Sequence, residues 1–447
     1  MPRCATATGS CCGPRGRSPW TPRQPMIAWT RPSSETRACL IRRPSALAPP
    51  WPRRPQTRRR CSSTSDPIRP RPSTWRKRSP NASQAWRDSS TIGSLRSRRI
   101  AARRGAPTHR EGRMTTRNAH EGVGWRGALT SRRIDDHDAI EWWRVAPEDA
   151  ATVADRAFDE QVRTPAGVHL SVVTSASALE FDVWIEKAAS SLDVLVDGVL
   201  ATRVALAHGW QTPHIELPAR TVEVLVVLPI DTPTRVGSVT FIGDKAPEPG
   251  RERTTRWVAY GSSITQGIGA AGPSDSWPWR VARSEGWSLT NLGLGGQCHL
   301  DPAIADQLRR TPADLISMCI GINIYGKRTF SARSLGPAVT GFVRRVREGH
   351  PTTPLVVVTP IACPDRESTP NADGLTLRDI RSIVAAATAR ATELDGIPVT
   401  IVDGLDVLNE NEAPLLPDRL HPNSDGYELM ARRLAPRLAD ALGGVTR

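Results

Sequence analysis

The stretch RWVAYGSSITQG, at residues 256–267, carries the pattern that decides the fold. An apolar run is followed by a tight Gly-Ser-Ser turn and then by a segment that can begin a helix, so we expect strand, turn and helix in that order. A side chain in such a turn lies beyond the carboxyl end of its strand, where reactive groups gather in open α/β sheets. Ser263 is therefore the first candidate catalytic residue.

An alternation of strands and helices continues from this stretch to the end of the chain. Helical periodicity recurs at residues 335–346, 377–391 and 429–442, where the apolar positions share one face. Short apolar strands between helices predict a parallel sheet covered on both faces. The expected strands are residues 256–260, 288–294, 313–321, 354–360 and 399–404.

A different pattern precedes residue 250. Between about residues 122 and 243, apolar runs of strand length are separated by short turns without intervening helices, which predicts a β-sandwich or jelly roll. Asp197-Gly198 between two apolar runs indicates a hairpin. Residues 245–253, rich in proline and charge, read as a linker.

Tryptophans of this β region admit two interpretations. They could form a platform on which a sugar stacks, or they could pack in the core, which is the more common role of tryptophan in a small sandwich. The four side chains concerned are Trp142, Trp143, Trp184 and Trp210.

The first 113 residues differ from the rest in composition. They contain 26 basic residues against four acidic ones, and 16 of the 39 prolines, whereas the remainder has 34 basic and 41 acidic residues. Such a segment cannot bury enough apolar surface to order itself, so we expect disorder. Its arginine tracts could bind nucleic acid, an interpretation we do not favour. We favour an untranslated upstream extension with initiation at Met114.

The sequence thus divides into three expected parts: residues 1–113, a β-sandwich with its linker at 114–250, and an α/β domain with a parallel sheet at 251–447. Neither Met1 nor Met114 is followed by a secretory signal, and no run of about 18 apolar residues is present. We therefore expect a cytoplasmic protein without a membrane partner. The scattered thiols of Cys298, Cys319 and Cys363 lack metal-ligand spacing and should be packing residues.

A second motif, DRLHP at residues 418–422, complements Ser263. It places Asp418 three residues before His421, so that a base and an orienting acid accompany the serine hydroxyl. Each motif alone is weak evidence, because serine-rich turns and single histidines are common. Together they predict nucleophilic catalysis.

The ends of the next two strands supply donors for a developing oxyanion. NLGLGGQ at residues 291–297 offers the N–H of Gly296, or alternatively that of Gly295. Asn323, in GIN after the third strand, offers its amide from the other side, and the N–H of Ser263 itself is the third donor. Three donors converging on one point would form an oxyanion hole.

These motifs resemble the four blocks of the SGNH (GDSL) hydrolase superfamily, which supply Ser, Gly, Asn and His in this order. YGSSITQG, GLGGQCHLDP, GINI and LLPDRLHPNSDGY look more closely like the two-domain bacterial esterases that carry an N-terminal jelly roll, a group that includes a salicylyl-ester hydrolase. The resemblance implies a flavodoxin-like three-layer α/β/α domain. It also implies Ser263 as nucleophile, Asp418 and His421 as its partners, and Ser263, Gly296 and Asn323 as the oxyanion hole.

The sequence departs from this family at two positions. Ser262 and Ile324 stand where the family usually has aspartates, which leaves the bracing of the serine turn open. Ser262 itself is an alternative nucleophile. Gln297 and His299 are possible substrate contacts, and His299 could instead cap the following helix together with Asp301. The other histidines, His169, His208, His214 and His350, have no catalytic company and should be surface or packing residues.

The expected function is that of a serine esterase acting through an acyl-enzyme on a small-molecule ester, with a short acyl group on a carbohydrate or secondary metabolite. No cofactor or metal is expected, and the pattern does not predict an oligomeric state. Two alternatives remain. One is an inactive carbohydrate-binding protein with the SGNH fold, and the other is nucleic-acid binding through residues 1–113.

Overall fold

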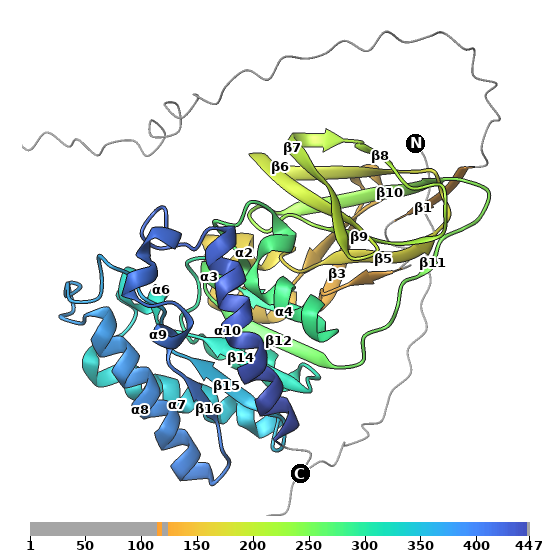
Figure 1. Cartoon of the computed structure of the whole chain (residues 1–447). Helices are drawn as coiled ribbons and strands as arrows, with labels where there is room; N and C mark the ends of the chain where they lie inside the picture. Colours follow the sequence, from red (N-terminus) through yellow and green to blue (C-terminus); the bar gives the residue numbers. More distant parts are fainter. Residues whose placement is uncertain (1–113, 119–123, 445–447) are drawn as a thin grey trace, which may run out of the picture. The chain divides into compact units, whose positions relative to one another are not determined.

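The computed structural model describes residues 114–118 and 124–444, and Figure 1 shows its elements. The expectations for residues 1–113, namely disorder, an untranslated extension and nucleic-acid binding, lie outside the described residues. Among the helices of the described part, none is long and apolar enough to cross a membrane.

The parallel sheet predicted from residue 256 onward is present. Its strand order is β13-β12-β14-β15-β16 and every neighbouring pair is parallel. In chain order this is 2-1-3-4-5, the flavodoxin-like arrangement, which confirms the expected fold class. The strands are β12 (Arg256–Gly261), β13 (Ser288–Gly293), β14 (Leu315–Cys319), β15 (Leu355–Val358) and β16 (Thr400–Val402).

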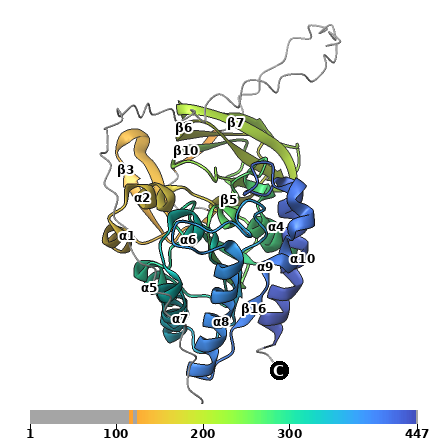
Figure 2. The same ribbon diagram turned by 90° about the vertical axis from the view of Figure 1, so that its left-hand side faces the viewer.

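Helices cover both faces of this sheet, as the alternation along β12 requires. Val258 and Tyr260 pack with α5, α7 and α8 in one core, whereas Trp257 and Ala259 pack with α4 and α10 in the other. Figure 2 shows α5 and α7 on one side of the domain and α10 on the other. The helices and short turns are α3 (Ser263–Gln266), η3 (Pro273–Asp275), α4 (Trp277–Glu285), α5 (Pro302–Arg310), α6 (Ile322–Lys327), α7 (Ala332–Gly349), α8 (Leu377–Asp395), α9 (Gly404–Val407), η4 (Glu410–Leu415) and α10 (Ser424–Gly443).

The region before residue 250 contains antiparallel strands that enclose a separate apolar core. The first part of β6 pairs with β10 and its last part with β9, so one long strand takes part on both sides of that core. This agrees with the expected β-sandwich. The strands are β1 (Met114–Asn118), β2 (Trp125–Arg126), β3 (Thr130–Ile134), β4 (Ala139–Trp143), β5 (His169–Thr174), β6 (Ala178–Val196), β7 (Val199–Gln211), β8 (His214–Glu216), β9 (Val222–Val227), β10 (Thr234–Ile242) and β11 (Glu248–Pro249), with η2 (Asp136–Asp138) between β3 and β4.

The hairpin expected at Asp197-Gly198 joins β6 to β7. Both residues have positive φ, 49° and 85°, as a tight two-residue turn between twisted strands requires. β6 continues without a turn through the polar residues near its middle. The chain accommodates them by a register shift between Ile185 and Ala189 instead of a turn.

The expectation of strands without intervening helices is wrong at one place. Helices α1 (Pro147–Val153) and α2 (Arg156–Arg163) follow β4. Asp155 caps α2 by accepting a hydrogen bond from the Phe158 N–H at 2.9 Å, and Phe158 and Val162, four residues apart, are fully buried. Both pack in the core that covers the parallel sheet, so part of the β region's sequence completes the other domain.

The four tryptophans are divided between two environments. Trp142 and Trp143 are buried in the apolar cores, as the packing interpretation states. Trp184 and Trp210 face each other across β6 and β7 and are half-buried. The Arg235 guanidinium lies 4.4 Å from the centre of the Trp184 ring, and the ring of Trp210 stacks on His137 at 4.1 Å. One face of each of these two tryptophan rings is therefore covered by another side chain of the protein.

Candidate active site

The carboxyl ends of three adjacent strands bring the predicted catalytic groups together. β12 lies between β13 and β14 in the sheet. Ser263 comes two residues after β12, Gly296 three residues after β13, and Asn323 in the first turn of α6, shortly after β14. Because the strands are parallel, all three turns lie at the same edge of the sheet.

The two serines of the turn after β12 make different contacts. The Ser262 hydroxyl is buried and accepts a hydrogen bond from the Ile264 N–H at 3.2 Å, so Ser262 caps α3. A Cβ atom at Gly261 would overlap the side chain of Thr265, and only glycine fits there. Ser262 thus braces the turn where the family usually has aspartate, while the hydroxyl of Ser263 is left half-exposed.

A chain of short hydrogen bonds links Ser263 to the motif near the C-terminus. The Ser263 Oγ lies 2.8 Å from His421 Nε2, and His421 Nδ1 lies 2.6 Å from Asp418 Oδ2. A carboxylate can only accept, so Nδ1 carries the proton and Nε2 presents its lone pair to the serine hydroxyl. The order of the three side chains is the one that a serine nucleophile, its base and an orienting acid require.

The Asp418 carboxylate is held by more than the imidazole. Its second oxygen accepts the backbone N–H groups of His421 at 2.7 Å and Leu420 at 3.0 Å. Partial burial by itself raises the pKa of the Asp418 carboxyl, but the hydrogen bonds from the His421 ring and backbone outweigh it. The pKa therefore lies below its usual value, and the group stays ionised at neutral pH.

The loop after α3 fixes the position of His421. Gly269 has a φ of 98°, and a Cβ atom there would lie 3.0 Å from the Cβ of His421. The Tyr427 hydroxyl donates to the Ile268 carbonyl at 2.6 Å, which ties this loop to α10. The histidine is thus backed by closely packed main chain.

The competing oxyanion donors Gly295 and Gly296 are distinguished by their hydrogen bonds. The Gly295 N–H donates to the side-chain oxygen of Gln266 at 2.7 Å. For the N–H groups of Gly296 and Ser263, the described part of the chain provides no acceptor. Gly296 is the glycine whose N–H is free to meet a substrate oxygen.

The side-chain amide of Asn323 is also oriented by a hydrogen bond within the protein. Its side-chain oxygen accepts the Cys298 N–H at 3.0 Å, so the NH₂ group is the end of the amide that remains for another acceptor. Ile324, the second departure from the family, is fully buried in the apolar core and contributes no polar group.

Two residues that sequence reasoning missed form hydrogen bonds with residues 293–295, directly before Gly296. Gln266, at 1% exposure, donates to the Ile230 carbonyl at 2.7 Å while it accepts from Gly295. Arg144 is fully buried and donates to the carbonyl of Gly293 at the end of β13 at 2.6 Å, and burial lowers its pKa to about 9. Gln266 belongs to the motif around Ser263, but its partners are distant in sequence; nothing near Arg144 in the sequence indicates its role.

His299 and Gln297 were predicted as possible substrate contacts. His299 Nε2 lies 2.9 Å from the Gly296 carbonyl, which can only accept, and Nδ1 lies 2.7 Å from the Thr329 hydroxyl. Both ring nitrogens are therefore engaged within the protein, and the Asp301 side chain makes no cap hydrogen bond to the helix that follows. Gln297 closes a backbone turn to Leu294 at 3.0 Å, and its side chain is half-exposed.

The remaining predicted groups lie outside this arrangement. His169 and His350 are buried, whereas His208 and His214 are exposed. The described cysteines are free thiols. Burial raises the pKa values of Cys298 and Cys319 to about 12, so neither thiol ionises at neutral pH.

Comparison with known proteins gives the family of this site. Residues 259–429 match the model of the GDSL-like Lipase/Acylhydrolase family. This segment is a GDSL-like hydrolase domain. The match contains Ser263, Gly296, Asn323, Asp418 and His421, and the domain is a carboxylic ester hydrolase. A search of the curated proteins found no match.

Solved structures extend the similarity to the β region. The salicylyl-acyltransferase SsfX3 from a tetracycline biosynthetic pathway is 29% identical, with a TM-score of 0.67, and the match covers 75% of this chain and 98% of that one. A Bacteroides ovatus protein described as a GDSL-like lipase is 20% identical, with a TM-score of 0.63 and coverages of 74% and 98%. A family two carbohydrate esterase from Cellvibrio japonicus is 16% identical, with a TM-score of 0.54 and coverages of 74% and 99%. The last two show a shared fold.

Proposed function

We propose that this GDSL-like hydrolase is a serine esterase in which Ser263 is the nucleophile, His421 the general base and Asp418 the residue that orients His421. The observation that carries the proposal is the continuous chain of hydrogen bonds, 2.8 Å from serine to histidine and 2.6 Å from histidine to aspartate. Apolar packing or a plain surface turn would not require these three side chains in this order.

The chemistry proceeds by two acyl transfers. His421 Nε2 takes the proton of Ser263 Oγ as the oxygen attacks the ester carbonyl, and the negative charge on the carbonyl oxygen is held by the donors of Ser263, Gly296 and Asn323. His421 then protonates the departing alkoxide, and the alcohol leaves. Water attacks the acyl-enzyme by the same route, giving its proton to His421, which returns a proton to Ser263 as the free acid is released.

For the substrate, we propose a short or compact acyl group on a carbohydrate or secondary metabolite. A cavity of about 310 Å³ is lined by Gly269, whose main chain packs against His421, and by Ser190 and Asp231 from the β region. Hydroxyl, carboxylate and main-chain groups on its wall suit a polar alcohol. The name of the 29% identical relative, a salicylyl-acyltransferase of a biosynthetic pathway, supports a compact acyl group.

The test uses the full chain and a fluorophosphonate probe, followed by a panel of acetylated sugars and aryl esters. Wild type and Ser262→Ala should be labelled and hydrolyse esters, whereas Ser263→Ala should do neither. Labelling that persists in Ser263→Ala, or a wild type that neither reacts nor hydrolyses any ester, would refute the proposal.

A second candidate function is acyl transfer to an acceptor other than water. It is favoured by the relative's designation as an acyltransferase, and the catalytic groups need no change because an alcohol can take the place of the water that attacks the acyl-enzyme. Product analysis with an aryl ester distinguishes the two. An added polyol that becomes acylated in place of free acid indicates transfer, and free acid alone indicates hydrolysis.

A further inference from the structure

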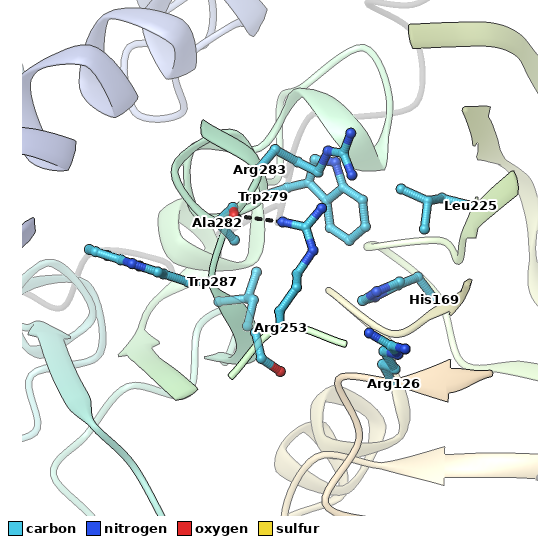
Figure 3. A pocket seen from close by; sticks show the side chains of 10 residues that line it. Arg126, His169, Leu225, Arg253, Trp279, Ala282, Arg283 and Trp287 are labelled. Carbon is cyan, nitrogen blue, oxygen red and sulfur yellow. Dashed lines mark hydrogen bonds between the residues drawn. The ribbon is translucent and has the colours of Figure 1, made fainter. Parts of the chain in front are cut away.

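A second cluster of charged side chains lies at the opposite end of the parallel strands from Ser263. The pocket concerned reaches Ser288 and Leu289, the first residues of β13, whereas the catalytic groups follow the last residues of the strands. Six residues of strand span about 16 Å, so this pocket is separate from the active site. Its polar and aromatic lining is Arg126, His169, Arg253, Trp279, Arg283 and Trp287 (Figure 3).

Three guanidinium groups in this pocket have no acidic partner. Arg126 donates to the carbonyls of Gly250 and Arg251, both at 2.6 Å, and Arg253 donates to the carbonyl of Ala282 at 3.0 Å. Within the described part of the chain, neither these two arginines nor Arg283 forms an ion pair with a carboxylate. Carbonyls carry no net charge, so these hydrogen bonds do not neutralise the guanidinium groups.

Two donors that line the pocket also lack acceptors. Arg283 Nη1 and Trp279 Nε1 are buried, and no acceptor for either lies within the residues that the structure describes. Trp279 is 4% exposed, because its ring packs against Leu225 and its neighbours, so bulk water cannot satisfy its N–H. Buried donors without a partner are rare in folded proteins and indicate a missing acceptor.

The neighbouring arginines affect the pKa of Arg253. Burial lowers the pKa of Arg253, and the neighbouring Arg283, followed by Arg126 and Arg251, lowers it further; Glu223 is the one acid that opposes this, and it is outweighed. Burial is the largest cause of the lowered pKa, and among the charged neighbours the arginines outweigh the single acid.

His169 is also affected by neighbouring arginines. Burial, together with the charges of Arg126, Arg253 and Arg283, lowers its pKa to about 4. At neutral pH the ring is therefore uncharged, and Nδ1–H donates to the Gly167 carbonyl at 3.0 Å. His169 supplies no negative charge to the pocket.

We propose that this pocket binds a single small oxyanion, a carboxylate or phosphate group, held by Arg253 and Arg283 and by the indole N–H of Trp279. Guanidinium groups pair with such anions through parallel hydrogen bonds, and one anion would satisfy both orphaned donors. The cavity of about 20 Å³ is small and suits one compact group, which excludes a polyanion such as nucleic acid.

Binding at this place would have a structural consequence. Arg126 belongs to β2, Arg253 to the segment that enters β12, and Arg283 to α4. An anion that bridges them exists only in the folded chain, so it should raise the free energy of unfolding by mass action. A bound anion would thus link the β region to α4.

The test is thermal unfolding of the full chain in sodium acetate, sodium phosphate and sodium chloride at equal ionic strength and pH 7. The enzyme is first labelled with fluorophosphonate, which occupies Ser263 and keeps the probe anions out of the active site. Acetate or phosphate at about 50 mM should raise Tm by about 2–4 °C over chloride. The larger of the two shifts identifies whether carboxylate or phosphate is preferred. Equal Tm values in all three salts would overturn the proposal.

Variants locate the effect. Arg283→Met keeps the length of the side chain and should abolish the anion-dependent shift; in chloride its Tm should be no lower than that of wild type, because a repulsive charge is removed. Arg390→Met, which removes an exposed arginine on α8, is the matched control and should retain the full shift. The same shift in both variants would refute the site. If Arg283→Met fails to fold, Arg253→Met with isothermal titration of acetate replaces it, and one site retained there would also refute it.

Discussion

The charge on Asp418 is held by three hydrogen bonds from only two residues, His421 and Leu420. One oxygen orients the imidazole, and the other closes the turn through the two N–H groups. A single carboxylate therefore positions both the ring of the base and the backbone that carries it.

Replacement of the Asp418 carboxylate tests whether it orients His421 without affecting substrate binding. In Asp418→Asn we expect kcat to fall by about 10³- to 10⁴-fold with a smaller change in KM, because an amide favours the wrong tautomer of His421. Asp406→Asn, an exposed aspartate near Arg437, is the control and should leave both constants unchanged. Steady-state kinetics with an aryl ester measures this, and a loss confined to KM would contradict it.

The pH dependence of stability follows from the lowered pKa of Asp418. Because the folded-state pKa lies below the unfolded value of about 3.9, the stabilising contribution is complete above that pH and is lost as the pH falls through the folded-state pKa. We expect the difference in unfolding free energy between wild type and Asp418→Asn to shrink below about pH 4. Urea unfolding at a series of pH values measures it, and a difference that stays constant or widens there would contradict the assignment.

His299 acts on the active site through Gly296. Its Nε2–H donates to the carbonyl of Gly296, whose N–H is the proposed oxyanion donor, so His299→Ala should lower kcat by about 10- to 100-fold with little change in KM. His299→Gln, whose amide can donate to the same carbonyl, should recover part of the loss. His208→Ala, an exposed histidine of β7, is the control. Equal kcat in His299→Ala and the control would show that His299 does not position this loop.

Among the elements, those with a strong local pattern were predictable. The apolar strands of the parallel sheet and the helical stripe of Leu335, Val339, Phe342, Val343 and Val346 were found because burial on both faces or on one stripe leaves a period in the sequence. Helices α1 and α2 were missed because they are short and only Phe158 and Val162 mark the buried face of α2. The long β6 was missed because its register shift keeps a polar stretch in the strand.

The importance of α2 can be measured. Phe158 is fully buried in the core of the parallel sheet, so Phe158→Ala should lower the free energy of unfolding by about 3–5 kcal/mol. Arg156→Ala, exposed on the same helix, should change it by less than about 0.5 kcal/mol. Urea unfolding followed by far-UV circular dichroism gives both values. A small effect of Phe158→Ala would mean that α2 is not part of the hydrolase core.

At the scale of the whole molecule, the sequence predicts which edge of the sheet carries the candidate catalytic residues. It does not predict the contacts from the β region that hold this edge in place. Parallel strands end at one edge, so Ser263, Gly296 and Asn323 could be brought together from their order in the sequence. The contacts of Gln266 with Ile230 and of Arg144 with Gly293 join residues far apart in the chain. Periodicity in the sequence carries no information about contacts between residues so far apart, and only the folded structure shows them.

The contacts that the β region makes with the hydrolase domain predict the behaviour of a truncated chain. A fragment of residues 251–447 contains all five proposed catalytic residues but lacks Phe158 and Arg144, so the core is left with a gap and the Gly293 carbonyl loses its donor. We expect it to unfold without a cooperative transition, to bind a hydrophobic dye and to lack esterase activity. A chain of residues 114–447 should show a cooperative transition. Cooperative unfolding with activity in the shorter fragment would contradict this expectation.

The β region also holds the loop beside His421. Asp193, fully buried, binds the backbone N–H and hydroxyl of Ser274 and the Arg203 guanidinium, which in turn contacts Asp275 at 2.9 Å. Evolution could therefore alter substrate choice through mutations in strands that contain no catalytic residue. A laboratory selection for new ester preference would need to diversify residues 189–191 and 230–231, and a library confined to the hydrolase segment would omit one wall of the cavity.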